Sequence, residues 1–141
     1  MTRDAIEKLV ARHKEAYARR DIDALANSHT EQVTFDSPAY GTVHGRDAIR
    51  DIFRYWYTAF PDMLLTWESA LIDPPRASWF WVLDGTAAGQ FFGDVKVGSK
   101  VRMIGASECE CSSEGIVAIR HVFDFSGALV RTGVMKMKPA S

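Results

Sequence analysis

The chain has 141 residues, 47% of them apolar and 25% charged, and its formal net charge is −1. This length and composition suit one globular domain with a buried core. A net charge so close to zero creates no field that would recruit nucleic acid or an anionic membrane, so neither is expected as a partner. No stretch approaches the roughly 20 apolar residues of a membrane span, and the charged N-terminus lacks the apolar centre of a secretory signal.

Three helices are predicted in the first half of the chain. Thr2 suits the N-cap of the first helix, and Asp21 suits that of a short second helix, IDALANSH. Gly45 precedes a third helix, RDAIRDIFRYWYTAF, which Pro61 ends. The apolar faces at helical spacing are Ile6, Leu9, Val10, His13 and Tyr17 on the first helix, and Ile49, Ile52, Phe53, Trp56 and Phe60 on the third.

Strand patterns fill the remainder. QVTFDSP alternates apolar and polar residues up to Pro38. From Met63 onward the period is two, and MLLTWESALID, ASWFWVLDGTAAGQF, KVRMIGASECEC and GIVAIRHVFDF read as four strands. Helices followed by a long, mostly antiparallel sheet predict a single α+β domain over residues 1–141, with three N-terminal helices on one face of a curved sheet that encloses an apolar pocket. The terminal KMKPAS is expected to be a frayed tail.

Two cysteines, Cys109 and Cys111, alternate with acidic residues in the run SECEC. Residues two apart on a strand share a face, so a disulfide between them would be strained. No CxxC or Cys/His set surrounds them, which argues against a zinc site. Both are therefore expected to be reduced, in a cytoplasmic protein that uses no metal.

Four stretches, in their order and spacing, resemble a known family. AYARRDIDAL looks like its opening helix pair, and HGRDAIRDIFRYWYTAFPD resembles its glycine-started helix ending in Phe-Pro-Asp. LDGTAAGQFFG resembles its central strand pair, and EGIVAIRHVFDFSGALVRTG its last strand, aspartate and short helix. The chain is thus similar to the SnoaL-like polyketide cyclases of the nuclear transport factor 2-like superfamily. The resemblance implies the cone-shaped fold of that superfamily, a homodimer, and a cyclase that needs no cofactor and takes a small apolar carbonyl compound.

The resemblance also implies a catalytic role for Asp124, which matches the family's acid/base aspartate. Ala118, Arg120, Val122 and Asp124 share one face of the last strand. If that face looks into the cone, burial would raise the pKa of the Asp124 carboxyl toward the range of a proton-transfer group. The same position, just before SGALV, also suits a helix N-cap, although Ser126 could take that role instead.

Glu108 and Glu110 alternate with the two cysteines, so one pair faces the cone and the other faces outward. Counted back from Asp124, the acids match polar pocket positions of the family, and Arg120 could pair with them there. Such a carboxylate–arginine–carboxylate set resembles the water-activating site of limonene epoxide hydrolase. Acids in solvent or at a dimer interface, with the cysteines inside, are the simpler alternative.

The other candidates are aromatic and histidine side chains that could bind substrate. Tyr17 and His13 lie one turn apart on the first helix and could donate hydrogen bonds to an enolate oxygen. His121 lies on the face opposite Asp124 under strict alternation, so a partly buried or interface position is the simpler reading. The expected wall residues, which are core residues by default, are Trp56, Phe53 and Trp81.

Two departures separate the chain from relatives of known pattern. Gly85-Thr86-Ala87 lacks the histidine of their Gly-Thr-His, and Ser37 stands where ketosteroid-isomerase-like relatives place their base. These departures argue against an isomerase, and the resemblance implies a cyclase that closes a ring by an aldol or related step. Two alternatives stay open: an epoxide hydrolase or epoxide-opening cyclase, and a module that binds a small ligand without chemistry.

Overall fold

The computed structural model describes residues 1–138, so the last three residues of the predicted KMKPAS tail lie outside the described part of the chain. The helices are α1 (Arg3–Ala18), α2 (Ile22–Asn27), α3 (Arg46–Ala59) and α4 (Phe125–Arg131). The strands are β1 (His29–Ser37), β2 (Gly41–His44), β3 (Leu64–Trp67), β4 (Leu71–Asp73), β5 (Arg76–Thr86), β6 (Lys100–Ser112) and β7 (Gly115–Phe123). Among the described residues, no helix combines the length and apolarity needed to cross a membrane.

The predicted helix starts are confirmed by their caps. The Thr2 hydroxyl accepts the Ala5 N–H at 3.1 Å, and the Asp21 carboxylate accepts the Ala24 N–H at 3.0 Å. Each side chain thereby satisfies a backbone donor that the first turn leaves without a helical partner. The apolar faces expected on α1 and α3 are buried except for the half-buried Tyr17.

The sheet has the order β2-β1-β7-β6-β5-β3, and β4 also pairs with β5. All pairs are antiparallel except β1 with β7. The single strand expected over MLLTWESALID is instead two strands, β3 and β4. Trp67 pairs with Trp81, and Leu71 pairs with Ser78. Between these two pairs the chain advances four residues from β3 to β4, whereas β5 advances only three. The extra residue breaks the strand as a bulge does.

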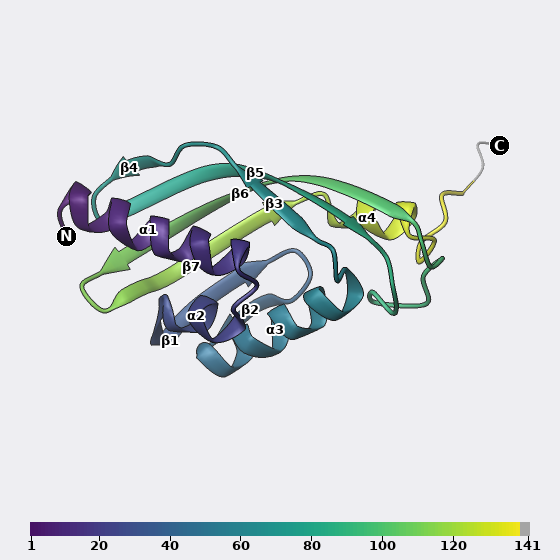
Figure 1. Cartoon of the computed structure of the whole chain (residues 1–141), viewed down its shortest axis with the longest axis horizontal. Coiled ribbons are helices and arrows are strands. Elements are labelled where there is room, and N and C mark those ends of the chain that lie inside the picture. The colour runs from purple at the N-terminus through teal and green to yellow at the C-terminus, as the bar shows by residue number, and fades with distance from the viewer. Residues whose placement is uncertain (139–141) are drawn as a thin grey trace.

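The helices α1, α2 and α3 lie on one side of the twisted sheet, and α4 follows the end of β7 (Figure 1). Helix α1 contacts β3 and β4, whereas α3 contacts β1 and β2. The core lies between this helix layer and the facing side of the sheet. Alternate residues of the long strands point into it, for example Trp79, Trp81 and Leu83 on β5.

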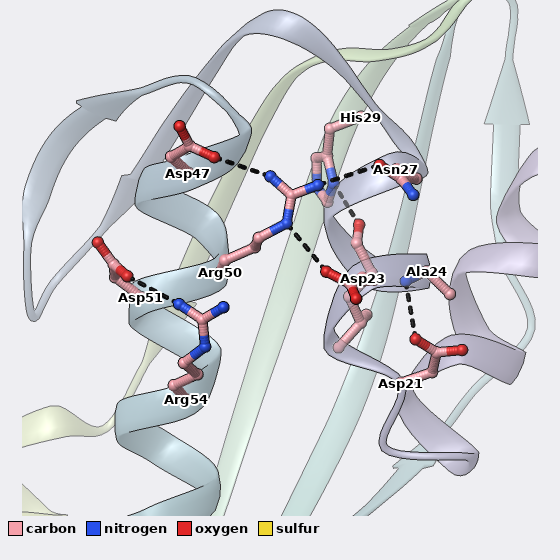
Figure 2. A network of polar contacts seen from close by, with 10 residues as sticks. Asp21, Asp23, Ala24, Asn27, His29, Asp47, Arg50, Asp51 and Arg54 are labelled. Carbon is pink, nitrogen blue, oxygen red and sulfur yellow. Dashed lines mark hydrogen bonds and ion pairs between the residues drawn. The ribbon is translucent and has the colours of Figure 1, made fainter.

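A polar network joins α2 to α3 on the outside of the helix layer. Arg50 of α3 donates to Asp23 at 3.1 Å, to Asp47 at 2.9 Å and to Asn27 at 3.3 Å (Figure 2). Its carboxylate partners are largely exposed, so solvent screens these ion pairs. The contacts to Asp23 and Asn27 link α3 to α2, which leads directly into β1 and the buried His29.

Candidate functional site

A cavity of about 60 Å³ lies between the inner face of the sheet and helices α1 and α3. Its wall is mostly apolar and includes the aromatic rings of Phe35, Phe53, Trp56, Trp67, Trp79, Trp81 and Phe123. The expected wall residues Phe53, Trp56 and Trp81 are therefore at the cavity. The volume exceeds the roughly 10–15 Å³ that one water needs, and aromatic walls favour a flat apolar ligand.

Five polar side chains face this apolar space: Tyr17, Ser37, Tyr40, Ser107 and His121. Among the described residues that line the cavity, none is Asp, Glu, Lys or Arg. Burial raises the pKa of Tyr40 to about 12, so its hydroxyl is a neutral hydrogen-bond donor at physiological pH. Burial likewise raises the pKa of Tyr17 well above its usual value. The polar chemistry of the cavity thus comes from neutral groups.

Ser107 and His121 form the most tightly connected pair in the wall. The Ser107 Oγ lies 2.6 Å from His121 Nδ1, and it accepts the indole N–H of Trp81 at 2.9 Å. Because an indole nitrogen only donates, the hydroxyl proton of Ser107 is free to go to the imidazole. Assigned from this network, His121 accepts at Nδ1 and carries its own proton on Nε2.

Gly105 makes the indole contact possible. A Cβ at this position would lie 2.2 Å from Cζ2 and 2.4 Å from Cη2 of Trp81. The indole of Trp81 therefore lies across β6 where a side chain would otherwise stand. This close approach sets the indole N–H within reach of Ser107, two residues further along the strand.

Two further histidines lie behind the wall. His13 and His29 are both fully buried, with ring centroids 5.2 Å apart. Burial lowers the pKa of His121 to about 3, with a smaller effect from the charge of His29, and lowers the pKa of His29 itself to about 4. All three are neutral at physiological pH, since His13 is shifted the same way. Within residues 1–138, no group of three or more His, Cys, Asp or Glu side chains is arranged to hold a metal ion.

The expectation that the Asp124 face looks into the cone is wrong. Asp124 is the N-cap of α4: its carboxylate accepts the Gly127 N–H at 3.0 Å and lies 3.5 Å from the guanidinium of Arg131. The side chain is 52% exposed, so it faces solvent and not the apolar cavity. The capping alternative describes its position, and the face that lines the cavity is the one that carries His121.

Glu108, Glu110 and Arg120 are also outside the cavity. All three are exposed on the outer face of the sheet, where Glu108 is directly opposite Arg120 in the pairing of β6 with β7. Cys109 and Cys111 occupy the inner face, both free and buried, with their sulfurs 3.5 Å apart. The structure therefore has the cysteines of β6 facing inward and its acids facing outward, as the simpler alternative described. Burying two carboxylates would cost far more free energy than burying two thiols.

Sequence reasoning placed Tyr17 and His13 together, but the structure separates their surroundings. Tyr17 lines the cavity, while His13 lies behind it with Nδ1 bonded to the Ser28 hydroxyl at 2.7 Å. Ser107 and Tyr40 were not singled out at all. Strand alternation could have indicated Ser107. It precedes Cys109 by two residues, so the two side chains share a face of the strand, and inward-facing cysteines place Ser107 inward as well.

The cone-shaped α+β architecture, with a cavity between sheet and helices, is the nuclear transport factor 2-like fold. The chain belongs to the SnoaL-like polyketide cyclase family, whose sequence model matches residues 7–130. This confirms the family that the sequence resembles. No match was found among curated proteins.

Solved structures show the same fold. A proposed SnoaL-like polyketide cyclase from Jannaschia sp. CCS1 has a TM-score of 0.83 at 14% identity, over 94% of both chains. AclR, a proposed hydroxylase from Streptomyces galilaeus, has a TM-score of 0.79 at 22% identity, over 94% of this chain and 83% of its own. IdmH, a proposed polyketide cyclase from Streptomyces antibioticus, has a TM-score of 0.76 at 18% identity, over 90% and 97%. At such identities the likeness establishes the fold alone.

Proposed function

We propose that this protein is a cofactor-independent cyclase for a small, mostly apolar carbonyl compound, in which His121 polarises the reacting carbonyl. The observation that carries the proposal is the 2.6 Å contact between Ser107 and His121 in the wall of an aromatic cavity. Because Nδ1 is engaged by Ser107, the Nε2–H is the part of the ring that can meet a ligand.

A neutral imidazole can donate a hydrogen bond to an enolate oxygen. The low pKa of His121 keeps the ring neutral at physiological pH. Its Nε2–H can then donate a hydrogen bond to the developing oxyanion. Ring closure by an aldol step forms one carbon–carbon bond and moves one proton from the α-carbon to the new hydroxyl. The proton balance closes within the substrate, and the protein supplies orientation, hydrogen bonding and exclusion of water.

The epoxide-opening alternative draws no support from the cavity, since its acid–arginine set, Glu108, Glu110 and Arg120, is on the opposite face of the sheet. Passive binding of a small ligand is the second candidate. It is favoured by the absence of any Asp or Glu among the described residues that line the cavity. The two candidates differ in one measurable respect, namely whether the cavity speeds the enolisation of a bound ketone.

The test uses 2-tetralone, a flat ketone with exchangeable α-protons, in deuterium oxide at pH 7 with proton NMR as the readout. The protein should accelerate exchange saturably, and His121→Phe should lose most of that rate, about a hundredfold for one oxyanion donor. His44→Phe, at an exposed histidine, is the matched control and should keep the rate. Saturable binding of 2-tetralone with no acceleration would leave the passive binding module as the function.

A second part of the proposal is a homodimer formed through the outer face of the sheet. Phe80, Ile104 and Val122 are 57%, 68% and 53% exposed there, and Phe80 and Val122 both flank Ala106 in register. Large apolar side chains grouped on one face are typical of interaction sites. The oppositely charged Glu108 and Arg120 beside them suit a symmetric contact, in which each residue meets its complement on a second copy.

A further inference from the structure

Two tryptophans form a partition between the cavity and the outside of the protein. Trp67 of β3 and Trp79 of β5 both line the cavity, and both also line a surface groove of about 210 Å³. Helix α1 forms the other side of this groove with residues that include Glu7, Ala11 and Lys14. The two indoles stack with 4.9 Å between their ring centroids and 17° between their planes. The stacked pair therefore stands between the cavity and the surface groove.

The cavity is too small for the ligand that the proposed function requires. Its volume of about 60 Å³ has room for a few waters, whereas ligand pockets usually measure roughly 300–1,000 Å³. The surface groove offers about 210 Å³ on the far side of the indoles. Moving one indole out of the partition would join the cavity to the surface groove and add the volume of the ring itself.

Of the two indoles, that of Trp67 has the less constrained backbone. Trp79 is 3% exposed and lies within β5, where it pairs with Ser107 of β6. Trp67 is half-buried and is the last residue of β3. The next residue, Glu68, still donates its N–H to the Phe80 carbonyl at 2.9 Å, and the chain then leaves the sheet until β4 begins. The ends of strands open more readily than their centres, so Trp67 is the side chain that can move.

The hydrogen bonds of the indoles point to the same residue. The indole N–H of Trp81 donates to Ser107 at 2.9 Å, which anchors that ring in the cavity wall. Within residues 1–138, the buried Nε1 of Trp67 has no hydrogen-bond partner. Its ring can therefore leave the wall without breaking a hydrogen bond, and outside the wall its N–H can bond to water. The aromatic contacts that it would lose, to Trp79 and to Tyr17 at 5.4 Å, are ones that a flat ligand ring can replace.

We propose that Trp67 is the gate of the ligand site: its indole turns outward, the cavity and the surface groove become one space, and a ring of the ligand stacks on Trp79 in its place. This deepens the proposed function and rests on it for the identity of the cavity as the ligand site. The ligand class is a flat, apolar compound of at least two rings, with one end near His121 and the other beside α1.

The first test follows the tryptophans of the unmodified chain by fluorine-19 NMR after incorporation of 5-fluorotryptophan. The four resonances are assigned by the signal that each Trp→Phe variant loses. The ligand is 2-naphthol, which has two flat rings and no ketone. Its addition should give the Trp67 resonance the isotope shift between light and heavy water that marks a solvent-exposed indole. Trp81, anchored by Ser107, is the internal control and should not gain that shift.

The second test measures the rate constants of 2-naphthol binding by stopped-flow fluorescence. Trp67→Leu removes the ring that has to move, so the association and dissociation rate constants should both rise. The expected rise is roughly threefold to tenfold, the factor equivalent to one aromatic stack, and the dissociation constant should change less than either rate constant. Tyr57→Leu is the matched control. It truncates a half-buried aromatic side chain of α3 that lines neither the cavity nor the surface groove, and it should keep both rate constants within twofold.

Binding of 2-naphthol without exposure of Trp67 overturns the gate, because the ligand then enters through another part of the wall. Unchanged rate constants in Trp67→Leu overturn it as well, as does a failure of 2-naphthol to bind either chain. Where Trp67→Leu does not fold, the fluorine spectrum of the unmodified chain decides. The outcome is separable from that of the proposed function: exposure of Trp67 with no acceleration of 2-tetralone exchange leaves the gate standing and removes the cyclase.

Discussion

Ser107 of β6 and His121 of β7 are direct neighbours in the sheet, and the hydroxyl oxygen of the first lies 2.6 Å from Nδ1 of the second. Trp79 of β5 continues the same row, opposite Ser107. Three adjacent strands thus place side chains at one level of the cavity wall. The pair orients the ring of His121, and with the Ser107 proton assigned to this contact it holds the imidazole proton on Nε2.

Replacing Ser107 with Ala should leave both the Trp81 indole N–H and His121 Nδ1 without a partner. Each unsatisfied buried group costs about 1–3 kcal/mol, so for the two groups the free energy of unfolding should fall by roughly 2–6 kcal/mol in urea titration. Nitrogen-15 NMR of the imidazole should show that His121 no longer holds a single tautomer. Ser113→Ala, at an exposed serine, should change neither quantity. An unchanged tautomer in Ser107→Ala would contradict the assignment.

Gly105→Ala tests whether the missing side chain positions Trp81. A Cβ would overlap the indole, and overpacking of this kind costs about 1–3 kcal/mol. The indole should move away from Ser107, which would shift the Trp81 indole N–H resonance in NMR spectra. Gly89→Ala is the control, since a Cβ there meets nothing within 4 Å. A resonance left in place by Gly105→Ala would show that Trp81 reaches Ser107 without this space.

Acid should destabilise the fold through its buried histidines. His121 and His29 have pKa values lowered from 6.5 to about 3 and about 4, so between these values and pH 6.5 the unfolded chain binds protons that the folded chain does not. Stability therefore rises with pH across this window and is lost as pH falls from about 6.5 toward 4, by up to about 1.4 kcal/mol per unit for each histidine.

The measurement is the free energy of unfolding from urea titrations at several pH values in that window. His121→Phe should flatten the slope by about one histidine's share, because it removes one of the groups that titrate only in the unfolded state. Ser113→Ala, at an exposed serine that does not titrate, should leave the slope as it is. Equal slopes in the His121→Phe variant and the unmodified chain would mean that His121 titrates normally in the fold.

Asp124→Asn separates a cap from a catalytic group. Asn is as good an N-cap as Asp, so stability should change by less than about 1 kcal/mol, and 2-tetralone exchange should be retained. Asp124→Ala removes the bond to Gly127 and should lower the free energy of unfolding by about 0.5–2 kcal/mol. A large loss of exchange in a stable Asp124→Asn variant would restore the proton-transfer role that the family resemblance implies.

The proposed dimer can be tested at its centre. Ile104→Asp places a charge in the exposed apolar patch, and burying that charge without a partner is costly, so light scattering after gel filtration should change from dimer to monomer. Val97→Asp makes the same substitution at an equally exposed position in the loop after β5 and should not alter the mass. A monomeric unmodified chain would rule out the dimer in solution.

Much of the fold was predictable because its signals are local. The N-caps Thr2 and Asp21 and the apolar faces of α1 and α3 depend on residues within a few turns of each other. The four-residue strand β2 was missed because it is too short for its alternation to be visible. The break between β3 and β4 was missed because a bulge is set by register against β5, which is distant in the sequence.

The sequence by itself determined that Asp124 and His121 lie on opposite faces, and that Glu108 and Glu110 oppose Cys109 and Cys111. Only the tertiary structure decided which of these faces looks into the cavity. The physical reason is that alternation along a strand has a period but no direction: it separates two faces without saying which one the helices cover. That choice depends on burial against α1 and α3, where thiols, a serine and a neutral imidazole cost far less than carboxylates.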